Sequence, residues 1–138
     1  MILVDTGPLV ALFDPKDDAH EDARRVLRAI RTRLVTTVPV LTEAMHLLDP
    51  GSRGAGALRA FVEAGGVTVW FLTDRSLARA FELMDRYSDH PMDLADASLV
   101  AAAETLRTTR VFTIDRRDFL AYRARIGRTA RAFTLVDG

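Results

Sequence analysis

Two short apolar runs in this sequence end abruptly on an aspartate. The first, MILVD, stops at Asp5, and the second, RVFTID, stops at Asp115 near the other end of the chain. Apolar runs without alternation are typical of strands buried on both faces, as in a parallel sheet covered by helices. Because two buried strands each end on a charged residue, we expect one common reason for the two carboxylates, at the edge of one sheet.

The rest of the chain alternates further strands with helices. We expect strands at residues 2–4, 34–37, 67–72, 110–114 and 133–136. We expect helices at residues 7–13, 18–30, 39–48, 53–64, about 74–87 and 93–106. This order predicts an α/β fold with a central, mainly parallel sheet of about 4–5 strands and helices on both faces. No linker, repeat or low-complexity segment interrupts it, so we expect residues 1–138 to form a single domain.

Composition excludes several classes of protein. The 138 residues include no cysteine, which excludes disulfides and thiolate metal sites. No stretch approaches the roughly 20 apolar residues of a membrane helix. The N-terminal apolar run lacks a basic start and contains Asp5, so it does not read as a signal peptide. We therefore expect a soluble, cytoplasmic protein with no membrane partner.

The net charge is zero, but it is unevenly distributed. Residues 107–138 hold eight arginines and three aspartates, a net charge of +5 that the remaining residues balance with −5. This asymmetry favours an anionic partner near the C-terminal part of the chain. Each of these arginines, taken singly, is also compatible with an ordinary surface charge.

Acidic residues from four segments are expected to meet. In open α/β sheets, ligands bind outside the carboxyl ends of the strands, where Asp5 and Asp115 are predicted to lie. Glu43 sits in a predicted helix among apolar neighbours, and Asp93 and Asp96 lie one turn apart at the start of an alanine-rich helix. Such carboxylates repel one another unless a cation neutralises them. Ligation by oxygen alone suits Mg²⁺ or Mn²⁺ and not Zn²⁺.

Several of these acids also have a purely structural interpretation. Asp93 is a good helix N-cap, Asp115 could begin an Asx turn, and Glu43 could be a solvated helix residue. Asp118 is expected to face solvent or to cap a helix. The three histidines share neither a helix face nor a metal-ligand spacing, so we interpret them as structural. Asp5 has no such alternative, since no capping partner follows it.

Four segments together resemble a known family. The stretches VDTGPLVALFD, VLTEAMHLL, MDLADASLVAAAE and FTIDRRDF, in this order and spacing, resemble PIN-domain proteins, and in particular the small toxins of the VapC type. The resemblance spans the whole chain. It implies a three-layer α/β/α fold with a central parallel sheet and Mg²⁺- or Mn²⁺-dependent endoribonuclease activity on RNA. It also implies a cognate antitoxin and a homodimer.

The resemblance assigns roles to individual acids. The four family acids correspond to Asp5, Glu43, Asp96 and Asp115, which are therefore the expected catalytic residues. Asp5, Asp96 and Asp115 are the expected metal ligands. Asp93 is the expected accessory acid, because two acids of this segment compete for one position of the motif.

Two threonines and one glycine near these acids complete the comparison. Thr113 resembles the small hydroxyl residue that the family carries near its metal. Many relatives have serine or asparagine two residues after the first acid, where this chain has Gly7. Any polar contact made at that point must come from Thr6 or from the backbone.

The arginines close to the fourth acid are the expected contacts to RNA. The candidates are Arg116, Arg117, Arg123 and Arg125, since guanidinium groups bind phosphate bidentately and stack on bases.

Two other classes of α/β protein with strand-end aspartates do not fit this sequence. A phosphoacceptor receiver domain needs a pair of adjacent acids and a late lysine, yet Lys16 is the only lysine. A phosphatase of the haloacid-dehalogenase type needs an aspartate where Gly7 stands. Two alternatives within the family stay open: an RNA-processing nuclease without an antitoxin, and a catalytically silent scaffold that binds RNA or a partner.

Overall fold

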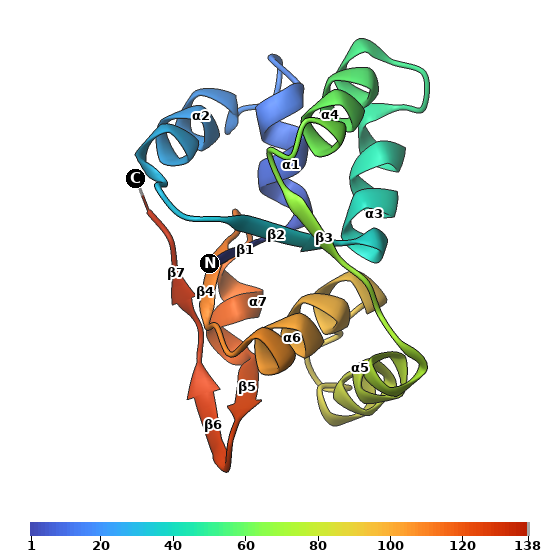
Figure 1. The fold of residues 1–138 in the computed structure, drawn as a ribbon, viewed down its shortest axis with the longest axis vertical. Coiled ribbons are helices and arrows are strands. Elements are labelled where there is room, and N and C mark those ends of the chain that lie inside the picture. Colours follow the sequence, from blue (N-terminus) through green and yellow to red (C-terminus); the bar gives the residue numbers. More distant parts are fainter. Residues whose placement is uncertain (138) are drawn as a thin grey trace.

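A five-stranded parallel sheet forms the centre of the molecule (Figure 1). The structure is a computed structural model and describes residues 1–137. The strands are β1 (Ile2–Val4), β2 (Leu34–Thr37), β3 (Thr68–Trp70), β4 (Arg110–Phe112) and β7 (Thr134–Leu135). Their order is β3-β2-β1-β4-β7, and all four neighbouring pairs are parallel. The predicted parallel sheet of about 4–5 strands is therefore confirmed.

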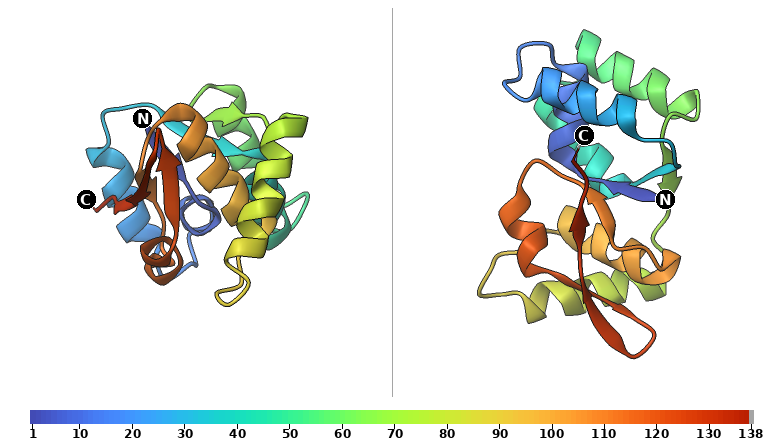
Figure 2. Two further views of the ribbon diagram at one scale, coloured as in Figure 1. Left: turned by 90° about the horizontal axis from the view of Figure 1, so that it is seen from below. Right: turned by 90° about the vertical axis from the view of Figure 1, so that its left-hand side faces the viewer.

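Helices cover both faces of this sheet. On one side lie α1 (Thr6–Phe13), α2 (His20–Ala29), α3 (Val38–Leu48) and α4 (Arg53–Glu63). On the other side lie α5 (Asp74–Arg86) and α6 (Leu94–Leu106), as Figures 1 and 2 show. The three-layer α/β/α arrangement is confirmed. Within residues 1–137, no helix combines the length and the apolar character needed to cross a membrane.

Helix α6 is the central helix of the second layer. Eight of its residues are buried, most of them alanines, because the sheet lies against one of its sides and α5 against another. A helix that is apolar on most of its faces is expected to be enclosed in this way. Small side chains let the two neighbours approach closely. The buried Leu99 and Val100 join strand residues such as Leu3 and Val111 in one hydrophobic core.

The C-terminal part contains elements that the sequence did not predict. A short helix, α7 (Arg116–Ala121), follows β4, and an antiparallel hairpin of β5 (Arg123–Ile126) and β6 (Thr129–Ala132) follows α7. In β5 the arginines point outward, while Ala124 and Ile126 are buried. This alternation is the ordinary strand pattern, but we considered these arginines only as RNA contacts or surface charges and not as part of a strand. Gly127 turns the hairpin with a φ of 65°.

The strand order creates a switch point between β1 and β4. The connection through α1 and α2 leads from β1 to β2 on one side, whereas α5 and α6 lead from β3 back to β4 on the other side of β1. In open α/β sheets, ligand sites form outside the carboxyl ends of the strands at such a point. Asp5 directly follows β1 here, and Asp115 lies three residues beyond the end of β4.

Candidate active site

A cavity of about 410 Å³ lies at this carboxyl edge and is strongly acidic. Seven acidic residues line it: Asp5, Asp17, Glu43, Asp93, Asp96, Asp115 and Asp118. We call it the acidic cavity. The structure brings all four predicted family acids into its lining, together with the predicted accessory residues Asp93 and Thr6. No arginine, lysine or histidine belongs to the lining found in residues 1–137.

Asp5 is the most enclosed of these carboxylates, with 8% of its surface exposed. It is the N-cap residue of α1, but its side chain makes no capping hydrogen bond and is free to face the cavity. The Thr113 hydroxyl donates to Asp5 Oδ2 at 2.8 Å. Thr113, the predicted accessory residue, therefore contacts Asp5 directly. Burial raises the pKa of Asp5 to about 6, and the charge of Glu43 adds to this rise. Hydrogen bonds from Thr113 and from the Thr6 backbone oppose it.

Asp96 points from the first turn of α6 toward the same cavity. Its Oδ2 accepts a hydrogen bond of 2.8 Å from the hydroxyl of Tyr122, a residue that sequence reasoning missed. Burial raises the pKa of Asp96 to about 8, and the charges of Asp5, Asp93 and Asp118 add to this effect. The hydrogen bond from Tyr122 lowers this pKa but does not offset the burial.

Asp93 caps helix α6, as its structural interpretation required. Its Oδ1 accepts a hydrogen bond of 2.8 Å from the Asp96 backbone N–H. The side chain also lines the acidic cavity, so its role as a helix cap leaves it beside the other acids. A capping carboxylate at a helix N-terminus is stabilised by the helix dipole, which makes a concentration of negative charge less costly here.

Asp115 and Asp118 stand one helical turn apart on α7. Asp115 is the N-cap residue of α7 but makes no side-chain capping bond, so the alternative of an Asx turn is not observed. Burial, slight at this exposed site, and the neighbouring Asp118 raise the pKa of Asp115, while Arg117 lowers it. Asp118 neither faces only solvent nor caps a helix with its side chain, because its Oδ1 lies 2.7 Å from His90 Nε2 and the residue lines the cavity.

Gly7 and Thr6 occupy the rim near Asp5. A Cβ atom on Gly7 would lie 3.2 Å from the Cβ of Ile114, so the Ile114 side chain occupies the space beside Gly7. The Thr6 Oγ1 is buried without a hydrogen-bond partner among residues 1–137. Buried hydroxyls normally have a partner, so this orphan atom beside Asp5 marks a site whose polar contacts are incomplete.

The four arginines predicted to contact RNA lie outside the cavity lining. Two of them have partners within the chain: Arg116 Nη1 donates to Asp137 Oδ1 at 2.7 Å, and Arg123 Nη1 donates to backbone carbonyls at the end of α7. For the side chains of Arg117 and Arg125, the described part of the chain offers no ion pair. These two are the freer candidates.

The donor chemistry of the cavity fits a hard divalent cation. All its charged groups are carboxylates, which are ligands that Mg²⁺ and Mn²⁺ accept. Burial, and after it the charges of neighbouring acids, raise the pKa values of Asp5 and Asp96, so a bound cation would favour the charged form of both carboxylates. The carboxylates surround the cavity without converging tightly: no three acidic or histidine side chains in residues 1–137 have the mutual geometry of a finished metal site.

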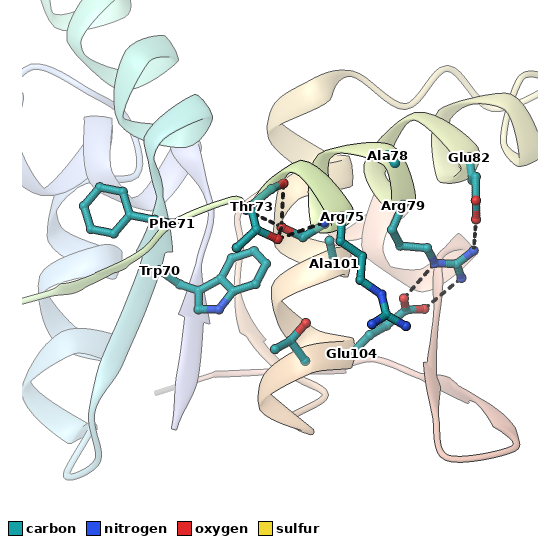
Figure 3. Close-up of a pocket in the computed structure, with 11 residues that line it drawn as sticks. Trp70, Phe71, Thr73, Arg75, Ala78, Arg79, Glu82, Ala101 and Glu104 are labelled. Carbon is teal, nitrogen blue, oxygen red and sulfur yellow. Dashed lines mark hydrogen bonds and ion pairs between the residues drawn. The ribbon is translucent and has the colours of Figure 1, made fainter.

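A larger cavity, of about 730 Å³, lies elsewhere, between the end of β3 and helices α5 and α6 (Figure 3). Trp70 stands on one wall and Arg75 and Arg79 on another, whereas the Phe71 ring points to the opposite side of the chain (Figure 3). Arg79 is held by Glu104, with bonds of 2.8 and 3.0 Å. The groove lacks clustered carboxylates and has mostly apolar walls, so it does not share the donor chemistry of the acidic cavity.

Comparison with known proteins identifies the family. The model of the PIN domain family matches residues 2–125 of this chain. The chain belongs to the PIN domain family. The acidic cavity therefore lies in the part of the chain that the family match covers.

Relatives of this PIN domain include two proteins of Mycobacterium tuberculosis. Ribonuclease VapC26 of strain H37Rv is 29% identical over 126 residues, which cover 88% of this chain and 92% of that protein. The crystal structure of VapC20, described as a Sarcin-Ricin loop cleaving toxin, is similar with a TM-score of 0.78 and 26% identity, covering 84% of this chain and 91% of that one. A toxin–antitoxin complex from Klebsiella pneumoniae shares the fold, with a TM-score of 0.68, 20% identity, and 88% and 92% of the two chains covered.

Sequence reasoning did not place Asp17 or Tyr122 at the site, and it left open whether Asp118 joins it. A signal for two of them existed. Asp115, Asp118 and Tyr122 are spaced i, i+3 and i+7, which places them on one side of a helix. Because no helix was predicted at residues 116–121, this spacing was not recognised as one side of a helix. Asp17 reaches the cavity from the turn before α2, and its Oδ1 accepts the Ala19 N–H at 2.8 Å.

Proposed function

We propose that this PIN domain is a Mg²⁺- or Mn²⁺-dependent endoribonuclease and acts as the toxin of a toxin–antitoxin pair. The observation that carries the proposal is the acidic cavity, where carboxylates from separated parts of the chain face one space at the switch point of the sheet. The relationship to Ribonuclease VapC26 over most of both chains supports RNA as the substrate. The likeness to the toxin VapC20 supports the toxin role. RNA as target, in turn, favours a cytoplasmic location.

The roles follow from the chemistry of the carboxylates. Asp5, Asp96 and Asp115 would hold the ion, and Thr113 would keep Asp5 in position through its hydrogen bond. When bound, such an ion supplies Lewis-acid stabilisation of the charge that develops on a phosphodiester group as water attacks it. Glu43, partly buried on α3, would accept the proton of the attacking water.

The substrate must approach through cations, because the acidic cavity itself repels phosphate. Arg117 follows two residues after Asp115, and Arg125 stands on the outer face of the hairpin, so both could hold the RNA backbone beside the cavity. An antitoxin would compete for the same surface. Its inhibitory segment would carry a basic side chain that compensates the carboxylates.

The experiment is cleavage of an RNA panel by the purified chain with Mg²⁺ or Mn²⁺. The panel includes a sarcin–ricin loop oligonucleotide, the substrate type named for VapC20. We expect products with a 5′-phosphate and a 3′-hydroxyl, and loss of cleavage with EDTA or in Asp5→Asn. Asp85→Asn, an exposed aspartate of α5 outside the cavity, is the matched control and should cleave normally.

The outcomes separate the alternatives. Cleavage that survives EDTA or Asp5→Asn would exclude the metal-dependent mechanism. Binding of RNA without cleavage would favour the silent scaffold. Cleavage without growth arrest on expression, with no small DNA-binding protein encoded immediately upstream, would favour an RNA-processing nuclease.

We also propose a homodimer formed through the groove of Figure 3. Phe71, which is 68% exposed, belongs to its lining. Arg75 has no ion pair within residues 1–137. If two α5 helices pack antiparallel about a twofold axis near Ala78, Arg75 of each copy faces Glu82 of the other, as a self-complementary interface requires.

A charge exchange tests this interface by light scattering after size exclusion. Arg75→Glu and Glu82→Arg should each shift the protein toward monomer, because like charges then meet. The double variant should restore the dimer. A wild-type monomer, or single variants that remain dimeric, would reject this face.

A further inference from the structure

Tyr122 is a fully buried residue at the end of α7, and its hydroxyl contacts Asp96, one of the acids that line the acidic cavity. The side chain has 0% exposure. Its hydroxyl donates to Asp96 Oδ2 at 2.8 Å, across a separation of 26 residues. The contact joins α7 to the first turn of α6.

The surrounding rings leave the phenol little freedom. Phe119, Tyr87 and His90 all meet the Tyr122 ring edge to face, with centroid distances of 5.3, 5.2 and 5.7 Å. The backbone is fixed as well, because the Tyr122 N–H donates to the Asp118 carbonyl at 3.1 Å and closes α7. A ring held in this way fixes the position of its hydroxyl oxygen, 2.8 Å from Asp96 Oδ2.

This hydrogen bond divides the two oxygens of the Asp96 carboxylate. Oδ2 accepts the hydrogen bond from Tyr122. Oδ1 accepts no hydrogen bond from any residue in the described part of the chain. A carboxylate fixed through one oxygen presents the other in a defined direction. Asp96 lines the acidic cavity, so this direction matters for whatever cation the cavity binds.

We propose that Tyr122 is a positioning residue that orients Asp96 for binding a divalent cation. The inference rests on the proposed metal-dependent function and adds a residue to it. Tyr122 does not touch the reacting atoms; it acts through Asp96. Helix α7 thereby contributes two cavity carboxylates, Asp115 and Asp118, and the hydroxyl that orients a third.

The second tyrosine of the chain is a matched control. Tyr87 belongs to the same aromatic cluster, and its hydroxyl also makes one hydrogen bond, accepting from the Arg123 N–H at 2.9 Å. That bond involves no acidic residue of the cavity. Tyr87→Phe and Tyr122→Phe therefore remove equivalent oxygen atoms from one cluster, and only the second removes a contact to Asp96.

The experiment is titration of the full chain with Mn²⁺ alone, followed by calorimetry, for the wild type and both variants. Tyr122→Phe should weaken Mn²⁺ binding by about 10–100-fold, the usual effect of losing the group that orients a metal ligand. Tyr87→Phe should stay within about twofold of the wild type. In the Asp96→Asn background, Tyr122→Phe should have no further effect on Mn²⁺ affinity, because the pair is already broken.

Three results would overturn the positioning role. These are wild-type Mn²⁺ affinity in Tyr122→Phe, equal weakening by both tyrosine variants, and an undiminished effect in the Asp96→Asn background. If Tyr122→Phe is partly unfolded in buffer, all proteins are compared in sucrose, which favours the folded chain. A wild type that binds no Mn²⁺ would reject the proposed function itself. A wild type that binds Mn²⁺ and cleaves RNA, beside an unaffected Tyr122→Phe, would reject only this inference.

Discussion

At the scale of single residues, the Thr113 hydroxyl is the main support of Asp5. Thr113→Val keeps the shape of the side chain and removes the donor to Asp5 Oδ2. Because this hydrogen bond stabilises the charged carboxylate, its loss should weaken Mn²⁺ binding about tenfold. Thr36→Val is the control: Thr36 is equally buried in the sheet, but its hydroxyl donates to the Val4 carbonyl. Calorimetry should find metal affinity unchanged in the control, and a loss shared by both variants would contradict the assignment.

Gly7 and Ile114 should behave as a coupled pair. A Cβ at Gly7 lies 3.2 Å from the Ile114 Cβ, which is closer than side chains normally pack. Gly7→Ser should therefore be less favourable in the wild type than in an Ile114→Gly background, which removes that Cβ. We expect a coupling energy of about 0.5–1 kcal/mol in a double-mutant cycle of urea unfolding. Additive free energies would show that Ile114, 43% exposed, simply moves aside.

At the scale of elements, two glycines of α4 should respond oppositely to alanine. A Cβ on Gly54 would lie 2.6 Å from the Phe13 carbonyl oxygen, because α4 crosses the end of α1 closely. Gly54→Ala should destabilise the fold by about 1–3 kcal/mol. Gly56 has open space around it, so Gly56→Ala should stabilise the helix by about 0.5–1 kcal/mol. Urea unfolding measures both, and the same sign for the two would refute the close approach.

Elements whose patterns agree with their burial could be predicted from sequence. The strand at residues 2–4 has the predicted bounds, and the alanine-rich helix begins after its predicted cap, Asp93. Strands β3 and β7 are shorter than residues 67–72 and 133–136, since flanking apolar residues continue past the last paired position. The hairpin after α7 was missed because its alternating arginines resemble a surface charge cluster.

The four family acids and Thr113 were predicted through the family resemblance, whereas the contact of Tyr122 with Asp96 was not predicted. Asp5 could be found from its position at the end of a predicted strand, without knowledge of the residues that contact it. The donor from Tyr122 to Asp96 depends on how α7 packs against α6, and no local pattern encodes that distance. The contact of Asp118 with His90 likewise joins residues far apart in the sequence, so no local pattern predicts it. The roles of the acids in catalysis remain predictions.

At the scale of the whole molecule, the enclosed carboxylates should make stability depend on pH. The pKa values of Asp5 and Asp96 rise from 3.8 to about 6 and about 8 in the folded state. The folded chain then binds more protons than the unfolded chain over this range, so stability falls as pH rises from about 4 to about 8. A tenfold change in proton affinity corresponds to ~1.4 kcal/mol, so the rise at Asp5 is worth on the order of 3 kcal/mol.

Thermal unfolding between pH 5 and pH 9 tests this expectation, with pH values spanning roughly the range in which both groups titrate. In EDTA the melting temperature should fall toward high pH. Saturating Mg²⁺ should reduce the fall, and Asp96→Asn should flatten its upper part. A profile that rises with pH in EDTA, or one that Mg²⁺ leaves unchanged, would contradict the electrostatic account of the cavity.

The pairing of β1 with β4 has a consequence for the protein during its own synthesis. Leu3 pairs with Val111, so two acids of the site, Asp5 and Asp115, meet only after a strand made at the start finds one made near the end. Contacts this distant in sequence form late in folding. A chain still being translated lacks β4 and α7, and with them Asp115, Asp118 and Tyr122. A ribosome making this protein would thus carry a nascent chain without an assembled acidic cavity until its last quarter has emerged.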